Sequence, residues 1–277
     1  MIRAVEVGAV ARAALGRSAG VAEPLAAHGP HYLLAAGEIV WLGGPGAVLH
    51  PRAVVTAGRL PGRPERVVVD LAGARLWDPP LPAPVATTAY AAVCAGLIAT
   101  LVMERPAHGL ATLLSPAMTP PPGLDGALLA RARPAVLALA AACDADDAAA
   151  AVAPATRLLG LGPGLTPAGD DLVGGVLFAR AVLARAGAAD GPAWALAGAA
   201  IVAAARVLTH PVSGALLADL AAGSGHAPLL DLVAALAGRR HDAALGAARR
   251  LAAIGHSSGW ETLAGFAAGT LGRRALE

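Results

Sequence analysis

The residue pattern changes near position 82, and this change constrains the fold more than any other feature of the chain. Residues 1–82 contain short apolar or β-branched runs separated by Gly and Pro. Residues 83–277 contain long Ala- and Leu-rich stretches broken by Gly, Pro and Asp, which is typical of packed helices. We therefore expect an α+β protein, with a β-rich N-terminal domain over 1–82 and a large all-helical domain over 83–277.

Turn residues such as Gly37 and Gly58 punctuate the first part, which favours a small antiparallel β-sheet or an open barrel. The expected strands are 31–35, 38–42, 48–50, 53–57 and 66–71. The expected helices are 85–103, 124–143, 146–159, 167–186, 193–208, 213–222, 228–237, 241–253 and 258–273. The abundant alanine lets helix axes approach closely, so we expect a compact bundle.

Composition excludes several classes of function. The chain contains no Lys, Asn or Gln, so all 21 basic residues are Arg. Schiff-base chemistry, pyridoxal phosphate and the lysine-bearing P-loop all need an amine that is absent here. A net charge of +2 and an aromatic content of 3% argue against nucleic acid as a partner.

The sequence gives only weak signals for a membrane span or a secretion signal. Glu6 interrupts the N-terminal apolar run too early for a signal peptide. Residues 79–103 are uncharged but contain Pro, Gly and much Ala and Thr, so we do not expect a membrane span. Cys94 and Cys143 have no second ligand at metal spacing. We expect a cytoplasmic protein.

A Gly/Pro-rich turn over residues 161–169 leads directly into an apolar stretch. Thr166 followed by Pro167 predicts a helix start with Thr166 as N-cap. The backbone amides of such a turn and the positive end of the helix favour an anion site. The structural alternative is a capped, buried helix in which Asp170 and Asp171 complement the helix dipole.

A second turn of this kind covers residues 254–259, and Glu261 follows Ser258 at the spacing of a capping box. Capping does not account for His256, which lies beside two hydroxyls at a predicted helix start. A weaker third break contains Thr209, His210 and Ser213. We interpret the other histidines as surface residues: His28, His31, His50, His108, His226 and His241.

The two glycine-rich turns, with Gly169-Asp170-Asp171 after the first and Trp260 after the second, resemble the AllH-like subunit of oxamate carbamoyltransferase. The resemblance covers residues 157–270. It implies FdrA-like and AllG-like partner subunits and the phosphorolysis of oxalurate to oxamate and carbamoyl phosphate. The chain departs from the family pattern at Ala168, where Ser is usual, and at Glu261, where Asp is common. A catalytic hydroxyl at position 168 is therefore not implied, and another ureido or carbamoyl substrate stays open.

The residues support a specific hypothesis for carbamoyl transfer. Backbone amides would hold phosphate at Gly162, Gly164, Leu165 and Thr166. His256 and Ser257 would donate to the developing oxyanion. Asp170 or Asp171 would orient the attacking amine, accept its proton or bind Mg²⁺, and we expect no other cofactor. The remaining substrate contacts are assigned to Ser258, Thr209, Ser213, Arg157 and Arg206.

Two alternatives stay open at this point. The chain could be a noncatalytic scaffold whose glycine-rich turns only cap helices and whose apolar faces bind partner subunits. It could also be a stand-alone Mg²⁺-dependent enzyme that uses Asp170 and Asp171 on a phosphorylated or ribosylated small molecule.

Overall fold

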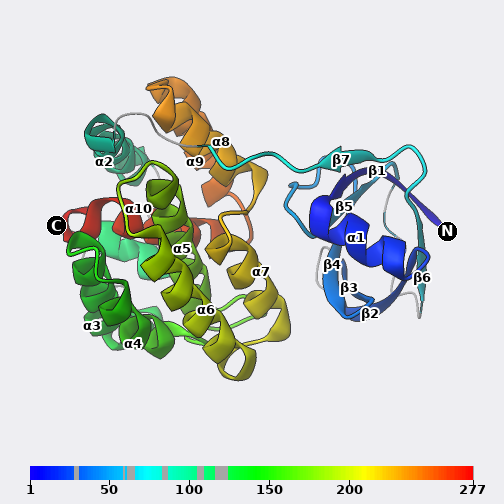
Figure 1. The fold of residues 1–277 in the computed structure, drawn as a ribbon, viewed down its shortest axis with the longest axis horizontal. Coiled ribbons are helices and arrows are strands. Elements are labelled where there is room, and N and C mark those ends of the chain that lie inside the picture. The colour runs from blue at the N-terminus through cyan, green and yellow to red at the C-terminus, as the bar shows by residue number, and fades with distance from the viewer. Residues whose placement is uncertain are drawn as a thin grey trace. The chain divides into compact units, whose positions relative to one another are not determined.

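The fold is that of an α+β protein, as expected, with the strands and one helix in the first part of the chain and the other helices after them (Figure 1). The computed structural model describes residues 1–27, 31–58, 60, 66–82, 87–104, 109–115 and 124–276. The chain divides into two compact units. One unit contains Met1–Pro80 together with Gly225–Ala227, and the other contains Leu81–Ser224 and Pro228–Glu277.

The first unit is a six-stranded barrel with one extra strand. Its strands are β1 (Ile2–Gly8), β2 (Val21–Ala27), β3 (His31–Ala35), β4 (Glu38–Gly43), β5 (Ala53–Thr56), β6 (Val67–Asp70) and β7 (Arg75–Trp77). The order is β5-β4-β3-β2-β6-β1-β7, and pairing of β5 with β1 closes the barrel. Of the two arrangements expected from the sequence, the barrel is therefore the one that forms.

The strand pairing is mixed rather than purely antiparallel. β1 pairs in parallel with β6 and β7, and β4 pairs in parallel with β5, whereas the other pairs are antiparallel. Parallel neighbours need longer connections than hairpins, so turn signals alone do not indicate them. The expected strand at 48–50 is wrong, because these residues form an irregular segment before the turn that precedes β5.

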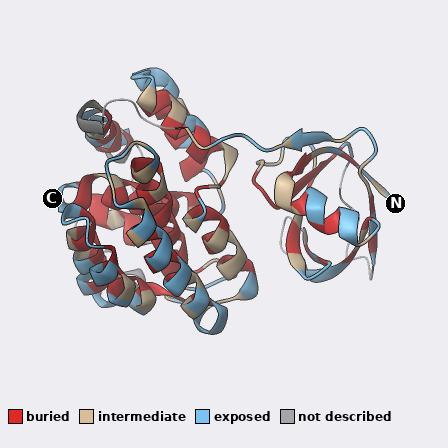
Figure 2. Cartoon of the chain, in the orientation of Figure 1, coloured by how far each residue is buried: buried red, intermediate tan, exposed pale blue. Residues whose placement is uncertain are grey.

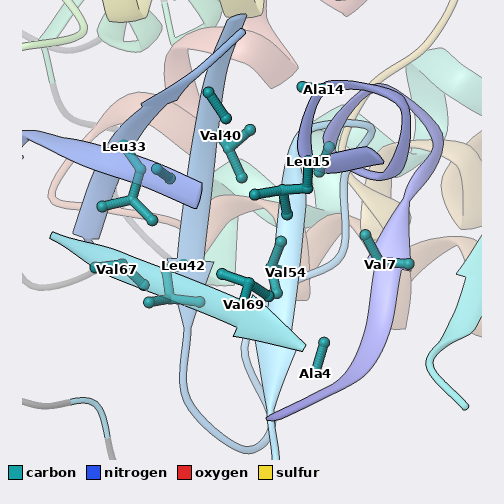
Figure 3. Packing of buried hydrophobic residues seen from close by; sticks show 13 residues of the cluster. Ala4, Val7, Ala14, Leu15, Leu33, Val40, Leu42, Val54, Val67 and Val69 are labelled. Carbon is teal, nitrogen blue, oxygen red and sulfur yellow. The ribbon is translucent and has the colours of Figure 1, made fainter. Parts of the chain in front are cut away.

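The barrel interior is filled by aliphatic side chains from the strands and from α1 (Ala9–Arg17), a helix that was not predicted from the sequence. Leu15 of α1 lies near Val40 and Val54, and all three are fully buried (Figure 3). Each such side chain contributes about 1.5–3 kcal/mol to stability when it is removed from water. Alanine-rich α1 therefore completes the core of the first unit.

The second unit is helical, and its α-helices begin and end within a few residues of the positions expected from the sequence. They are α2 (Thr87–Glu104), α3 (Leu124–Asp144), α4 (Ala148–Leu158), α5 (Ala168–Arg185), α6 (Gly191–Leu208), α7 (Pro211–Ala221), α8 (Ala227–Ala237), α9 (His241–Ala252) and α10 (Ser258–Leu271). Two short 3₁₀ helices, η1 (Gly109–Leu114) and η2 (Gly272–Ala275), were not expected. Almost every residue of α5 and α10 is buried (Figure 2).

Helices α5 and α10 pack with their backbones in contact. A Cβ atom added to Gly265 of α10 would lie 1.9 Å from the carbonyl oxygen of Leu172. One added to Gly175 of α5 would lie 2.2 Å from the carbonyl oxygen of Thr262. Only glycine fits at these two positions, because any side chain would overlap the facing backbone. This close approach brings the N-terminal ends of the two helices together.

A buried arginine fixes the other end of α5. Arg180 pairs with Asp146 and lies over the ring of Trp194, 4.7 Å from its centroid. The indole N–H of Trp194 donates to Asp146 at 2.7 Å, and the backbone N–H of Asp190 donates to the other oxygen of that carboxylate at 2.9 Å. This network links α5, the start of α6 and the turn before α4, and it was not predicted from the sequence.

Among the residues that the structure describes, two helices are long and apolar enough to cross a membrane on length and composition alone, Gly126–Asp144 and Gly191–Leu208. About 44% and 28% of their respective windows are buried inside the protein. Core helices of soluble proteins have the same length and composition.

Candidate functional site at two glycine-rich loops

The loop before α5 adopts a backbone shape that requires glycine. Gly160, Gly162 and Gly164 have φ angles of +72°, +124° and +93°. A Cβ atom at Gly160 would also lie 2.3 Å from the carbonyl oxygen of Leu208, and one at Gly162 would lie 2.8 Å from the backbone nitrogen of Ala168. The glycine spacing noted in the sequence therefore has both a conformational and a steric cause.

Thr166 does not cap α5, contrary to the expectation from the sequence. The helix begins at Ala168, and Pro167 occupies the N-cap position without a side-chain cap. The amides that a capping residue would satisfy already have partners, since Gly169 donates to the carbonyl of Leu161 and Asp170 to that of Pro167. The Thr166 hydroxyl instead lies 2.9 Å from the hydroxyl of Ser258, at the start of α10.

The four amides assigned to phosphate have no partner within the described part of the chain. These are the backbone N–H groups of Gly162, Gly164, Leu165 and Thr166. Pro163 and Gly164 are exposed, and the rest of the loop is half-buried. The loop therefore presents several donors close together on an accessible segment, which is the arrangement that binds oxyanions.

Asp170 connects the loop before α5 to the segment between α6 and α7 that contains Thr209 and Ser213. One carboxylate oxygen accepts the N–H of Gly160 at 2.7 Å. The other accepts the hydroxyl of Ser213 at 2.7 Å and that of Thr209. Asp170 lies in the first turn of α5 and Ser213 in the first turn of α7, so the positive ends of two helices face this carboxylate. Both of its oxygens are therefore already engaged, and the two hydroxyls assigned to substrate binding are hydrogen-bonded to Asp170.

Asp171 differs from Asp170 in its hydrogen bonding and in its pKa. Its side chain is buried, and one carboxylate oxygen has no hydrogen-bond partner among the residues that the structure describes. Burial raises the pKa of Asp171 well above its usual value, and the charge of Asp170 adds to this, while a hydrogen bond from Ser258 acts in the opposite direction. A buried carboxyl of this kind favours its protonated form, which can donate a hydrogen bond.

The second loop also differs from the expected capping box. Ser257 is the N-cap of α10 but makes no side-chain cap. Glu261 is fully buried and accepts the N–H of Leu110 in η1 at 2.9 Å, so it does not reach back to the start of its own helix. His256 is exposed in the turn before α10 and has an interaction partner. The loop thus places Ser257 one residue and His256 two residues before Ser258.

The third break forms a conventional helix start. His210 is the N-cap of α7, and its Nδ1 atom accepts the N–H of Val212 at 3.2 Å. This bond places the ring proton of neutral His210 on Nε2.

Two arginines assigned to the substrate lie on neighbouring helix ends. Arg157 is exposed in the last turn of α4, and Arg206 is exposed in the last turn of α6. These helix ends are adjacent, because Gly160 approaches the carbonyl of Leu208. Neither arginine forms a salt bridge within the described ranges. Both guanidinium groups therefore lack an acidic partner among the described residues.

His50 and His226, both expected at the surface, are instead packed in the first unit. His50 is buried, and its ring centroid lies 5.1 Å from that of Trp41 and 5.0 Å from that of His226. Burial lowers the pKa of His50 well below its usual value, with smaller contributions from His226 and Arg52. Burial also lowers the pKa of half-buried His226 to about 4.

The remaining histidines have mixed outcomes. His241 is exposed, as expected, with Asp242 3.8 Å away. His28, His108 and the side chain of His31 lie outside the described residues. Within the described ranges, no group of three or more His, Cys, Asp or Glu side chains is placed to hold a metal ion.

These observations define a class: an α+β protein whose helical unit carries two glycine-rich loops at the adjoining N-terminal ends of two tightly packed helices. Residues 158–270 match the model of a family described as oxamate carbamoyltransferase subunit AllH. The resemblance seen in the sequence is therefore confirmed over this range, which contains both loops and the Asp170 contacts. Among curated proteins there is no match to the chain, and no solved structure matches it either.

Proposed function

We propose that the chain is a component of a carbamoyltransferase and binds phosphate or carbamoyl phosphate at residues 162–166. The observation that carries this proposal is the set of four unpartnered amides on the accessible loop before α5. The family described as oxamate carbamoyltransferase subunit AllH supports the reaction class, because its model covers this loop. The reaction would convert oxalurate and phosphate to oxamate and carbamoyl phosphate.

The chemistry makes three demands on the site. A phosphate oxygen attacks the carbamoyl carbon of oxalurate, the carbon–nitrogen bond to oxamate breaks, and the proton lost by phosphate is balanced by one gained at the leaving nitrogen. Amides at 162–166 would hold the phosphate, and His256 and Ser257 would donate to the oxyanion of the tetrahedral intermediate. Arg157 and Arg206 would bind the carboxylate of oxalurate.

The two neighbouring aspartates would then have separate roles. Asp170 holds the loop in place through Gly160, Thr209 and Ser213, so it is a positioning residue. Asp171 keeps an oxygen without a partner among the described residues, and its raised pKa favours a protonated carboxyl, which suits a group that donates a proton. Of the two aspartates, we therefore assign the proposed proton-transfer role to Asp171.

Phosphate binding is tested by titrating inorganic phosphate into ¹⁵N-labelled protein and following the backbone amides. We expect saturable shifts at Gly162, Gly164, Leu165 and Thr166. Amides of the exposed turn at Gly187, which has a similar positive φ but lies at the far end of α5, serve as the control. Unchanged resonances at 162–166 with phosphate in large excess would refute the anion site.

Catalysis is tested with His256→Ala in the presence of partner subunits. Removal of one oxyanion donor costs about 2.7–4 kcal/mol, so turnover should fall at least about a hundredfold. His241→Ala, which changes an exposed histidine at the start of α9, should leave turnover unchanged. A folded His256→Ala protein with full activity would remove His256 from the mechanism.

The second candidate function is a noncatalytic subunit that binds FdrA-like and AllG-like partners. The observation in its favour is the solvent side of α6, where Leu196 and Val207 are 75% and 84% exposed. Leu196→Glu should abolish co-purification with the partner subunits if α6 is the contact. Loss of the complex in Leu196→Glu, combined with full activity in His256→Ala, would favour this candidate over the first.

A further inference from the structure

We propose that residues 225–227 act as a strap that couples the barrel unit to the helical unit, and that the strap leaves the barrel when His50 and His226 take up protons. The strap belongs to the barrel unit, although Ser224 before it and Pro228 after it belong to the helical unit. The chain therefore passes between the two units after residues 80, 224 and 227. Two of these passages lie at the ends of the strap, so docking of the strap adds to the covalent connection at residue 80.

A backbone hydrogen bond and a ring contact hold the strap within the barrel unit. The N–H of Ala227 donates to the carbonyl of Leu49 at 2.8 Å. The ring centroid of His226 lies 5.0 Å from that of His50, and the His50 ring lies 5.1 Å from that of Trp41. His50 is buried, whereas His226 and Ala227 are half-buried. The strap thus docks on residues 49 and 50 through its backbone and through one imidazole.

The barrel residues that receive the strap are also fixed by other parts of the barrel. The N–H of Ala11 in α1 donates to the carbonyl of Pro51 at 3.1 Å. The N–H of Trp41 in β4 donates to the carbonyl of Arg52 at 2.8 Å. Residues 49–52 therefore keep contacts with α1 and β4 when the strap is absent, and release of the strap does not require the barrel to unfold.

Protonation would place cations close together in a region from which water is largely excluded. Among the described residues, no carboxylate forms a salt bridge with either imidazole. Arg52, whose charge acts on His50, is paired with Glu38 at 2.9 Å. Two imidazolium rings whose centroids are 5.0 Å apart would repel each other, and each would be repelled by Arg52. Release of the strap separates these charges and returns both rings to water.

The other charged groups on the adjoining elements do not offset this repulsion. They are Arg3 and Glu6 on β1, Arg12 and Arg17 on α1, Glu38 on β4, Asp219 on α7 and Asp231 on α8. Glu6 pairs with Arg75 and Asp231 pairs with Arg250, so both carboxylates are engaged elsewhere.

The pKa values of the two histidines agree with this geometry. Burial lowers the pKa of His226 to about 4. Burial, His226 and Arg52 together lower the pKa of His50 well below its usual value. Both rings are therefore neutral in the docked strap at neutral pH, and both bind a proton more readily once the strap is released. Docking is consequently favoured above pH 6.5 and is weakened as the pH falls below it.

Hydrogen exchange at the Ala227 amide tests the proposal in the full chain. Ala227 is the first residue of α8, and amides in the first turn of a helix have no acceptor within that helix. Protection of this amide therefore depends on the Leu49 carbonyl. After correction for the intrinsic rate, protection should fall between pH 7.5 and pH 5.5 by about tenfold for each histidine that takes up a proton on release. Ala227 should exchange faster than the amides of β4 and β5 at every pH, because the barrel stays folded.

Two substitutions at position 226 separate the effect of charge from general damage to the strap. His226→Phe keeps a ring but takes up no proton, so the pH dependence of Ala227 protection should be reduced by about tenfold. His226→Arg carries a charge at every pH, so Ala227 should be poorly protected even at pH 7.5 while β4 and β5 stay protected. His241→Phe and His241→Arg are the matched controls, because His241 is exposed at the start of α9, and both should keep the wild-type profile.

Four outcomes would overturn the proposal. Wild-type protection of Ala227 that does not change with pH would exclude release by protons, and so would an unchanged pH dependence in His226→Phe. Full protection of Ala227 in His226→Arg would show that charge at this position does not release the strap. Exchange of Ala227 at the same rate as β4 and β5 at every pH would mean that the barrel opens as a whole.

Coupling of the two units is measured by ¹⁵N relaxation on the same samples. When the strap is released at pH 5.5, the rotational correlation time of the barrel unit should fall relative to that of the helical unit. His226→Arg should show this fall already at pH 7.5. An unchanged ratio of correlation times in a protein whose Ala227 amide has lost its protection would show that the strap does not couple the units.

Discussion

One set of glycines in the barrel unit and one pair in the helical unit are required for different physical reasons. In the barrel unit, Gly37, Gly46 and Gly73 have φ angles between +75° and +82°, and a Cβ atom there would meet nothing within 4 Å. In the helical unit, Gly175 and Gly265 lie within α-helices but face the backbone of the neighbouring helix. Glycine thus provides backbone freedom at the first three positions and absence of volume at the other two, so the same substitution has different consequences.

The largest effect that this comparison predicts is for Gly265→Ala. The added methyl group would overlap the Leu172 carbonyl, and neither backbone can move without disturbing the α5–α10 contact. We expect the free energy of unfolding to fall by more than about 3 kcal/mol, at the upper end of overpacking effects. Urea unfolding followed by circular dichroism measures the change. A loss below about 1 kcal/mol would show that the two helices are not in backbone contact.

Buried ionisable groups provide a second contrast, because the two units respond to pH in opposite directions. The pKa of His50 and that of His226 are lowered in the folded barrel unit, so the unfolded chain takes up more protons as the pH drops below 6.5. Stability of this unit is therefore lost as the pH falls from 6.5 toward about 4. The raised pKa of Asp171 acts in reverse, because its contribution is full below pH 3.8 and is lost as the pH rises.

We therefore predict that acidification weakens the barrel unit first. Between pH 6.5 and pH 5.5 its free energy of opening should fall by about 1–2 kcal/mol, since one pKa unit corresponds to about 1.4 kcal/mol. Amide hydrogen exchange, corrected for the intrinsic rate and compared between β4–β5 and α5–α10, measures this. His226→Gln should reduce the effect, and His241→Ala should not. Equal acid sensitivity of the two units would contradict the contrast.

The smallest predicted effect is a gain in stability for Gly246→Ala. Gly246 lies inside α9, and the nearest atom to an added Cβ is 3.7 Å away, at the end of the flexible Arg250 side chain. Alanine is favoured over glycine in a helix interior by about 0.5–1 kcal/mol. The urea midpoint should therefore rise slightly. If Gly246→Ala were destabilising, replacement of any helical glycine could lower stability in this protein. The loss expected for Gly265→Ala would then not be evidence for close contact between the α5 and α10 backbones.

The sequence was most informative where the physical signal is local. Alanine and leucine stretches bounded by glycine, proline and aspartate placed the helices of the second unit within a few residues. Strand β1 and helix α1 were missed, because a charged, alternating segment such as 2–8 and an alanine-rich segment such as 9–17 have weak patterns of their own. Their structure depends on pairing and packing with residues far along the chain.

The same difference between local and long-range signals applies to the candidate site. The sequence identified the glycine-rich loops and Asp170, Asp171, Thr209, Ser213 and Ser258, and the structure brings these residues into two connected groups. It could not separate the two aspartates, because their difference arises from hydrogen bonds to residues 10 to 43 positions away. Gly160 was missed as an Asp170 partner for that reason. The burial of His50 was missed because it requires Trp41 and His226 to pack around it.

The backbone contact between α5 and α10 also determines how much the two glycine-rich loops would have to be ordered when a molecule binds. Two helices joined through carbonyl-to-glycine contacts cannot slide or rotate independently, so the loops that precede them keep a constant separation in the absence of any ligand. If residues 162–166 bind an anion as proposed, its donors would already be held at fixed positions, and little conformational entropy would be lost on association.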